Sequence, residues 1–146
     1  MEFDIIPMQK THKSEVLSMM REFYSSNAVF TSGSEEIFLN DYNNCINNNP
    51  CLEGFVFCSC NEVLGYAIVA RSFSTEFGKA CIWFEDLFVK KQYRKKGIIK
   101  KFINLIVDKN PGAIFRLEAE KVNKNALIAY QKLGFFELPY VGMVKL

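Results

Sequence analysis

Histidine is almost absent from the sequence, because His12 is the single one in 146 residues. It lies in a polar stretch, Thr11 to Glu15, where we expect it to be solvated. Ser-His-Asp and Cys-His arrangements need a histidine as general base, so this nucleophile chemistry is disfavoured. The five cysteines are odd in number and have no C-x-x-C spacing. We therefore expect reduced thiols and, with so little histidine, no metal site.

Long hydrophobic runs are also missing. No apolar run approaches the ~20 residues that span a bilayer, and Met1 to Asp4 lack the basic start of a signal peptide. We expect a cytoplasmic protein without a membrane partner. Hydrophobic residues make up 49% of the chain and charged residues 23%, which is typical of a globular protein. The length suits one domain over residues 1–146.

Positive charge is concentrated in one short stretch. Seven of the eighteen Lys and Arg residues lie between Lys90 and Lys101, which leaves eleven against sixteen Asp and Glu residues, a net charge of −5, elsewhere. A nucleic-acid binder more often spreads its basic residues along a stripe, so we expect no nucleic-acid partner. A compact anionic ligand fits the cluster better, and the acidic remainder suits a cationic co-substrate.

Apolar periodicity and turn residues predict the order of the helices and strands. The expected elements are a strand closed by Pro7, a helix capped by Thr11, a helix capped by Ser34, strands 55–60 and 64–70 joined by a turn at Asn61-Glu62, strand 80–89, a helix after Gly97, strand 113–120, a helix from Asn123 to Gly134, and strands 135–138 and 141–144. This order predicts an α/β fold with a mixed, mostly antiparallel sheet, a central parallel strand pair and helices on both faces.

The basic stretch has the chemistry of a pyrophosphate site. It joins a strand ending at Val89 to a helix, and Gly97 lies where the loop turns into that helix. Free backbone N–H groups and the positive end of the helix dipole favour a bound anion there. Glycine lets the backbone approach a phosphate closely. A solvated basic turn before an ordinary amphipathic helix is the alternative interpretation.

Two motifs resemble signatures of the GNAT N-acetyltransferase superfamily. Arg94-x-x-Gly97-x-Ile99 is similar to the acetyl-CoA motif Gln/Arg-x-x-Gly-x-Gly/Ala, with Ile99 in place of the small third residue. Asn123-x-x-Ala126-x-x-x-Tyr130-x-x-x-Gly134-Phe135 is similar to the second signature, and follows the first in the required order. The resemblance implies a GNAT-like fold, acetyl-CoA as co-substrate and no metal.

The same resemblance implies where the coenzyme binds. Backbone N–H groups of the loop would hold the pyrophosphate, and the loop's cations would neutralise it. Donors at the strand end would polarise the thioester carbonyl. We expect the side chain at position 99 to turn toward the core while its N–H remains a donor. The residues expected at the coenzyme are Leu87, Phe88, Val89, Arg94, Lys95, Lys96, Gly97, Ile98, Ile99, Asn123 and Tyr130.

Asn123 and Tyr130 each allow two interpretations. Asn123 can simply cap a helix, and in the family it also contacts the pantetheine arm. Tyr130 can be a core tyrosine with its hydroxyl bonded to a neighbour. In the family it is the general acid that protonates the departing CoA thiolate, for which a phenol of pKa ~10 is adequate.

Glu85 and Asp86 are adjacent carboxylates in an apolar strand. Neighbouring strand residues face opposite sides, so at least one should point into covered space unless a bulge intervenes. Its partner could be structural, such as Arg71 or Arg116. Alternatively, the pair receives an ammonium group of pKa ~10.4 and relays its proton. The pair is similar to that of spermidine/spermine and related diamine acetyltransferases.

The resemblance therefore implies an enzyme that transfers acetyl from acetyl-CoA to a primary amine of a small molecule, possibly a polyamine or diamine, within a ternary complex. Glu85, Asp86 and Tyr130 are the expected catalytic residues. Three alternatives stay open: a non-catalytic acyl-CoA-binding regulatory module, an acetyltransferase of a protein N-terminus or lysine, and a nucleic-acid-binding module. The two late strands could also pair across a homodimer.

Overall fold

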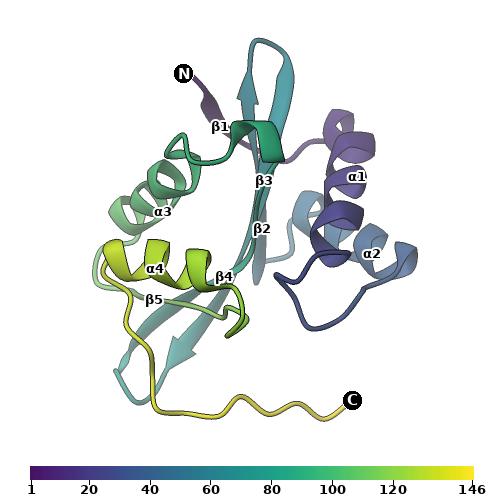
Figure 1. Ribbon diagram of the computed structural model, residues 1–146. Helices are drawn as coiled ribbons and strands as arrows, with labels where there is room; N and C mark the ends of the chain where they lie inside the picture. Colours follow the sequence, from purple (N-terminus) through teal and green to yellow (C-terminus); the bar gives the residue numbers. More distant parts are fainter.

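The computed structural model describes residues 1–146 as a five-stranded sheet with helices on both faces (Figure 1). The elements are β1 (Asp4–Pro7), α1 (Lys13–Tyr24), α2 (Glu35–Ile46), β2 (Leu52–Ser59), β3 (Glu62–Ser74), β4 (Lys79–Val89), α3 (Ile98–Lys109), β5 (Ile114–Leu117) and α4 (Lys124–Lys132). The strands lie in the order in which they occur in the chain, and β4 with β5 is the parallel pair. The predicted mixed sheet is confirmed. None of the helices combines the length and the apolar character that a membrane span requires.

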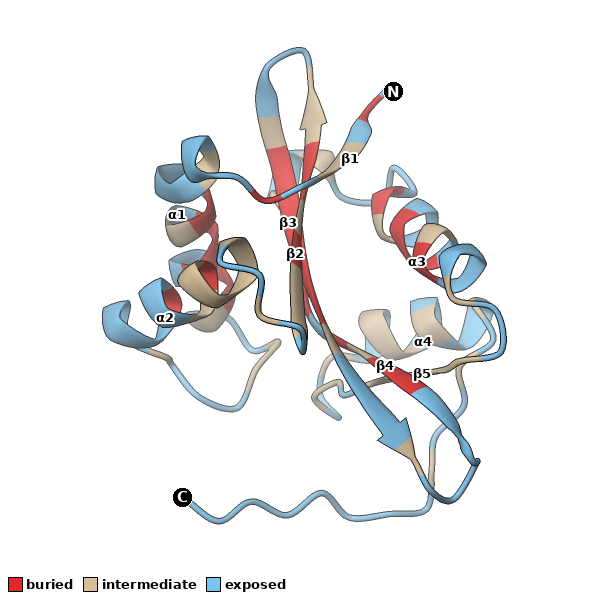
Figure 2. Ribbon diagram, turned by 180° about the vertical axis from the view of Figure 1, so that it is seen from behind, coloured by how far each residue is buried: buried red, intermediate tan, exposed pale blue.

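The two faces of the sheet bury separate apolar cores, because alternate strand residues point to opposite sides. Val56, Tyr66 and Phe88 belong to the core under α1 and α2. Phe57 and Phe84 belong to the core under α3, against which α4 also packs. Buried positions accordingly line the inner sides of α1, α2 and α3 (Figure 2).

Three boundaries predicted from local signals have different outcomes. Ser34 caps α2 as predicted, since its hydroxyl accepts a hydrogen bond from the N–H of Ile37. The predicted Thr11 cap is wrong, because a 3₁₀ turn (Lys10–His12) precedes α1 and His12 occupies the cap position. The hairpin turn between β2 and β3 lies one residue earlier than predicted. Cys60 and Asn61 form it with φ of 47° and 67°.

The end of the chain differs from the prediction. β5 stops at Leu117 and not near residue 120. The predicted strands 135–138 and 141–144 are wrong, because neither pairs with another strand. An extended apolar segment forms a strand only where an edge supplies its backbone partners. This segment runs away from the sheet (Figure 1).

Candidate active site

The parallel strands β4 and β5 part in the middle of the molecule. Their pairing runs from Cys81 with Ile114 to Phe84 with Leu117, whereas β4 continues to Val89. The last five residues of β4 therefore have no neighbour on that edge. A gap in a sheet leaves backbone donors and acceptors available to a ligand.

The strand register shows which donors face this gap. The N–H of Lys90 donates to the carbonyl of Leu64 in β3, at 2.9 Å. Alternate residues of a strand direct their N–H groups to opposite edges, so those of Leu87 and Val89 point into the gap. Both were expected at the coenzyme.

Phe88, also expected there, directs its backbone to the other side. A Cβ at Gly65 of β3 would lie 2.3 Å from the carbonyl oxygen of Phe88, so this close approach requires glycine. Phe88 is paired with Tyr66 in the ladder, and its ring is buried under α1. Its backbone is thus part of the sheet, and the gap receives its donors from the residues on either side.

Left-handed backbone positions turn the chain from β4 into α3. Lys95 has φ of 62° and Gly97 has φ of 78°. Gly97 is the N-cap of α3 and no side chain caps the helix there. The N–H groups of its first turn therefore remain free of side-chain acceptors, and they coincide with the positive end of the helix dipole. This geometry fits a pyrophosphate.

Three cations of the loop and helix are already bonded within the chain. Lys90 forms an ion pair with Glu15, with 3.0 Å between Nζ and Oε2. The Nε of Arg94 donates to the Val89 carbonyl at 2.8 Å. Lys101 donates to the Phe3 carbonyl at 3.0 Å. These contacts position the loop and leave less of its charge for a ligand than the sequence predicted.

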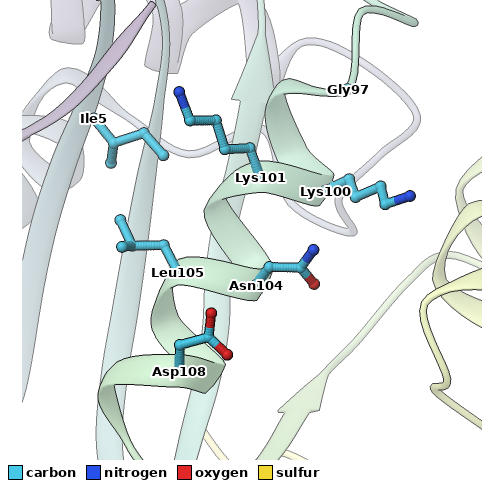
Figure 3. Close-up of a pocket in the computed structure, with 7 residues that line it drawn as sticks. All are labelled: Ile5, Gly97, Lys100, Lys101, Asn104, Leu105 and Asp108. Atoms are coloured by element: carbon cyan, nitrogen blue, oxygen red, sulfur yellow. The ribbon is translucent and has the colours of Figure 1, made fainter.

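Lys95, Lys96 and Lys100 form no ion pair with a carboxylate. The ammonium of Lys96 lies 5.4 Å from the centre of the Tyr93 ring. A shallow hollow of about 430 Å³ lies beside α3 (Figure 3) and includes no residue of β4 or β5, so it is separate from the gap. Its lining consists of Ile5, Gly97, Lys100, Lys101, Asn104, Leu105 and Asp108.

The two isoleucines after Gly97 hold the start of α3 in place. Ile98 is buried, and Ile99 packs against the same core. The side chain of Ile99 thus turns inward, as expected. The departure from the acetyl-CoA motif does not place a bulky side chain on the loop surface.

Asn123 and Tyr130 lie at the two ends of α4. The side chain of Asn123 accepts from the N–H of Ala126 at 3.4 Å, so the capping role is present. Tyr130 packs partly buried against the α3 core, with its ring 6.1 Å from that of Phe135. Burial alone raises the pKa of Tyr130, without a hydrogen-bond partner, which keeps the phenol protonated.

A cleft of about 510 Å³ opens where β4 and β5 part, on the side of α1. It contains four carboxylates and a single cation, and aromatic rings form much of the remaining wall. Such a lining favours an organic cation. The lining residues are Tyr24, Ala28, Val29, Phe30, Trp83, Phe84, Glu85, Asp86, Glu118, Ala119, Glu120 and Lys121.

Asp86 is the one buried charged residue, with 5% of its surface exposed. The hydroxyl of Tyr24 donates to Oδ1 at 3.1 Å, and that of Tyr66 donates to Oδ2 at 2.8 Å. Burial raises the pKa of Asp86 to about 6, although both phenols oppose the shift. The structural partners considered from sequence, Arg71 and Arg116, are wrong. Their guanidinium groups instead contact the Glu53 carboxylate and the Trp83 ring, respectively.

Glu85 is the extra residue of a β-bulge, because Ile68 is opposite Asp86 and Val69 is opposite Phe84. The bulge leaves Glu85 exposed at the cleft, while Asp86 points inward. Partial burial first, and then the charges of Glu118 and Asp41, raise the pKa of Glu85. Both adjacent carboxylates thus reach the same cleft.

Sequence reasoning missed two groups beside this site. Asp41 lies close enough for its charge to raise the pKa of both Glu85 and Asp86. Tyr24 is the other, because no local pattern connects it with a carboxylate 62 residues away.

Tyr130 lies in the helical layer opposite the cleft and is not among the residues that line it. The cleft and the gap nevertheless share the point where the two strands separate, at Phe84. A ligand that passes through the gap would therefore contact both the cleft and the gap.

The chain contains no cluster of three or more His, Cys, Asp or Glu side chains able to hold a metal ion.

Known proteins resemble this chain in sequence and in fold. The chain is 38% identical over 80 residues to the thialysine N-epsilon-acetyltransferase of Bos taurus, a match covering 52% of this chain and 46% of that protein. The chain thus spans about half the length of the curated relatives it matches.

Solved structures share the fold. A possible acetyltransferase from Clostridium difficile 630 has a TM-score of 0.80 at 18% identity, covering 98% of this chain and 96% of that one. The aminoglycoside acetyltransferase AAC(6')-Iy, in complex with a bisubstrate analog, has a TM-score of 0.78 at 18% identity, covering 99% and 98%. The acetyltransferase (GNAT) family model matches residues 16–135, well over half of the chain. The chain therefore belongs to the GNAT acetyltransferase family.

Proposed function

We propose that this protein transfers the acetyl group of acetyl-CoA directly to a primary amine of a small molecule. The observation that carries the proposal is the meeting of two sites at one break in the sheet. The β4–β5 gap and the basic loop offer donors to a nucleotide thioester. The acidic, aromatic cleft that opens at the same break suits an ammonium group. Holding both reactants there would make the transfer effectively intramolecular.

The residues on the coenzyme side fit acetyl-CoA. The free N–H groups that begin α3 would hold the pyrophosphate, and Lys95 and Lys96 would balance its charge. The N–H groups of Leu87 and Val89 would bind the part of the coenzyme that enters the gap. One of them would polarise the thioester carbonyl. Asn123, whose side-chain amide nitrogen is not used in capping, would contact the pantetheine arm from the other wall.

The acceptor is proposed to be an amine with more than one positive charge, such as a diamine or polyamine. The cleft contains Glu85, Asp86, Glu118 and Glu120 but only one lysine. One carboxylate suffices to hold the reacting ammonium, so the others would bind a second cationic centre. The name of the curated relatives, thialysine N-epsilon-acetyltransferase, also describes a small amine acceptor.

An ammonium group becomes nucleophilic only after it loses a proton. Asp86 would hold the ammonium, and Glu85, exposed at the cleft, would pass the proton to water. The amine nitrogen then forms a bond to the acetyl carbon while the carbon–sulfur bond breaks, and the nitrogen loses its second proton to the water in the cleft. The proton of Tyr130 would neutralise the departing thiolate, and the phenol would recover it from solvent.

The decisive experiment is a panel of amines assayed for release of free CoA thiol. It should contain polyamines, diamines, monoamines, amino acids, a lysine peptide and a peptide with a free N-terminus. We expect the highest kcat/KM for a diamine or polyamine. Acetyl-CoA binding without thiol release from any amine would identify a non-catalytic binding module. Preference for the peptides would identify a protein acetyltransferase.

A further inference from the structure

One wall of the acidic cleft includes an aromatic ring that already carries a cation from the chain itself. Trp83 of β4 lines the cleft, and the guanidinium carbon of Arg116 lies 4.7 Å from the centre of its ring. The two residues are neighbours in the register of the parallel pair β4–β5. A positive charge over an indole is held by electrostatic attraction to the ring face. Trp83 is thus a cation site in the wall of the cleft, and Arg116 occupies it.

Strand alternation explains why Arg116 reaches this side of the sheet. Phe115 and Leu117 pack against the α3 core, so Arg116 between them points to the opposite face, where the cleft opens. Its guanidinium forms no ion pair with a carboxylate. Arg116 is not itself among the residues that line the cleft. The cleft therefore ends at Trp83, and an unpaired positive charge lies on the ring at that end.

The carboxylates of the cleft all lie on the other side of Trp83, toward the break in the sheet. Glu85 and Asp86 follow Trp83 in β4, and the two glutamates after β5 follow Arg116 in the parallel chain direction. The cleft is thus negative near the break and bounded by a positive charge at its Trp83 end. A strand rises about 3.3 Å per residue, so Asp86 and Trp83 lie at most on the order of 10 Å apart along β4.

We propose that Arg116 limits the length of the acceptor, so that the cleft selects short linear diamines over long ones. This inference rests on the proposed function, in which Asp86 holds the reacting ammonium group. The second ammonium of a short diamine stays among the carboxylates, which attract it. The second ammonium of a diamine longer than the cleft reaches Trp83, where the ring is occupied and the charge of Arg116 repels it.

Binding can be measured without turnover, because Trp83 is the only tryptophan in the chain. CoA carries no acetyl group to transfer, so a diamine added to the CoA complex binds and does not react. We would titrate this complex with linear diamines from ethylenediamine to octamethylenediamine and follow Trp83 fluorescence, with calorimetry as a second readout. The best short diamine should bind about tenfold more tightly than octamethylenediamine. Burial of additional methylene groups alone would raise the affinity steadily with length, and that result would overturn the proposal.

Three variants test whether Arg116 causes this preference. Arg116→Gln removes the charge and frees the Trp83 ring, so octamethylenediamine should bind within about twofold of the best short diamine. Arg116→Lys keeps a cation and should keep the preference, whereas a purely structural role predicts the same loss in both variants. Lys121→Gln is the matched control, because it removes a charge from the cleft lining after β5 and should tighten binding of all diamines alike. A preference retained in Arg116→Gln would overturn the proposal.

The thiol-release assay with the same diamines distinguishes this proposal from the proposed function. Binding with the expected length dependence, but no thiol release from acetyl-CoA, would overturn acetyl transfer and support the role of Arg116. Thiol release with equal kcat/KM across the series would support the transfer and overturn the role of Arg116. The absence of saturable binding by any diamine would also overturn it.

Discussion

The hydroxyl of Tyr66 donates a 2.8 Å hydrogen bond to the buried carboxylate of Asp86 across neighbouring strands. Asp86 is opposite Ile68, and Tyr66 lies two residues from Ile68 on the same face. The β-bulge at Glu85 allows this hydrogen bond, because the extra residue changes which side chains of β4 face α1. The sheet thereby places a carboxylate in an apolar layer and holds it with phenols instead of cations.

The acid limb of the pH–rate profile should come from Asp86. Its pKa of about 6 means that below this pH the carboxyl is protonated and no longer holds an ammonium group. We expect kcat/KM for the amine to fall as the pH drops below about 6 in the parent. Asp86→Asn should reduce kcat/KM by about 10²-fold and abolish this limb. Comparison with Glu85→Gln distinguishes the contributions of the two carboxylates to kcat/KM. Full activity of both variants would contradict the proposed proton route.

The same carboxylate should make stability depend on pH. The folded-state pKa lies above the ordinary value of about 3.9, so the native state binds more protons than the unfolded state between about pH 4 and 6. The free energy of unfolding should therefore decrease as the pH rises through this window, by about 3 kcal/mol for a shift of this size. Urea unfolding of the parent and of Asp86→Asn at both ends of the window measures the difference. Parallel pH dependence in the two proteins would contradict the buried ionised carboxylate.

Tyr130→Phe should reduce turnover much more than coenzyme affinity. Loss of a general acid typically costs about 10²–10⁴-fold in rate, while the ring still packs against the α3 core. Calorimetry with CoA should give a Kd within about twofold of the parent, since the hydroxyl makes little difference to binding of the free thiol. Tyr42→Phe is the control. It loses a hydrogen bond to the Gln9 carbonyl in the other layer and should lower only stability, by about 1 kcal/mol.

Gly97→Ala tests the loop conformation. An alanine Cβ would meet no atom within 4 Å there, so the substitution acts only through φ of 78°. A left-handed non-glycine residue costs roughly 1–2 kcal/mol. We expect this loss of stability together with weaker CoA binding. Gly78→Ala has the same open surroundings and φ of 62° at the hairpin tip. It should show the same loss of stability and unchanged CoA affinity, and a matching affinity loss there would contradict a pyrophosphate site at Gly97.

The cations of the basic cluster should differ in their effect on CoA. A Lys95→Ala and Lys96→Ala double variant should weaken binding by about tenfold at low salt, and less at high salt. Lys101→Ala removes a single charge, from a side chain already bonded to the Phe3 carbonyl. It should leave the Kd for CoA within about twofold of the parent. Equal effects of the two changes would indicate a diffuse basic surface, for which salt-sensitive RNA or DNA binding is then the measurement to make.

Local patterns in the sequence determined most of the fold and half of the site. Some features depend on neighbouring residues alone, so they could be predicted. They are the apolar periodicity of β4 and α3, the Ser34 cap and the turns at Gly97 and Gly134. The basic loop was predictable for the same reason. The orientation of its lysines could not be predicted, because the groups that bind Lys90 and Lys101 lie in α1 and before β1.

Tertiary structure decided the rest. Whether Asp86 is held by arginines or tyrosines depends on a bulge in β4 and on a helix 62 residues away, neither of which leaves a local signal. The C-terminal segment has the apolar pattern of a strand but forms none, because its backbone pairs with no other strand. A side chain's chemistry is local to the sequence, whereas its partner, its burial and hence its pKa are properties of residues that only folding brings together.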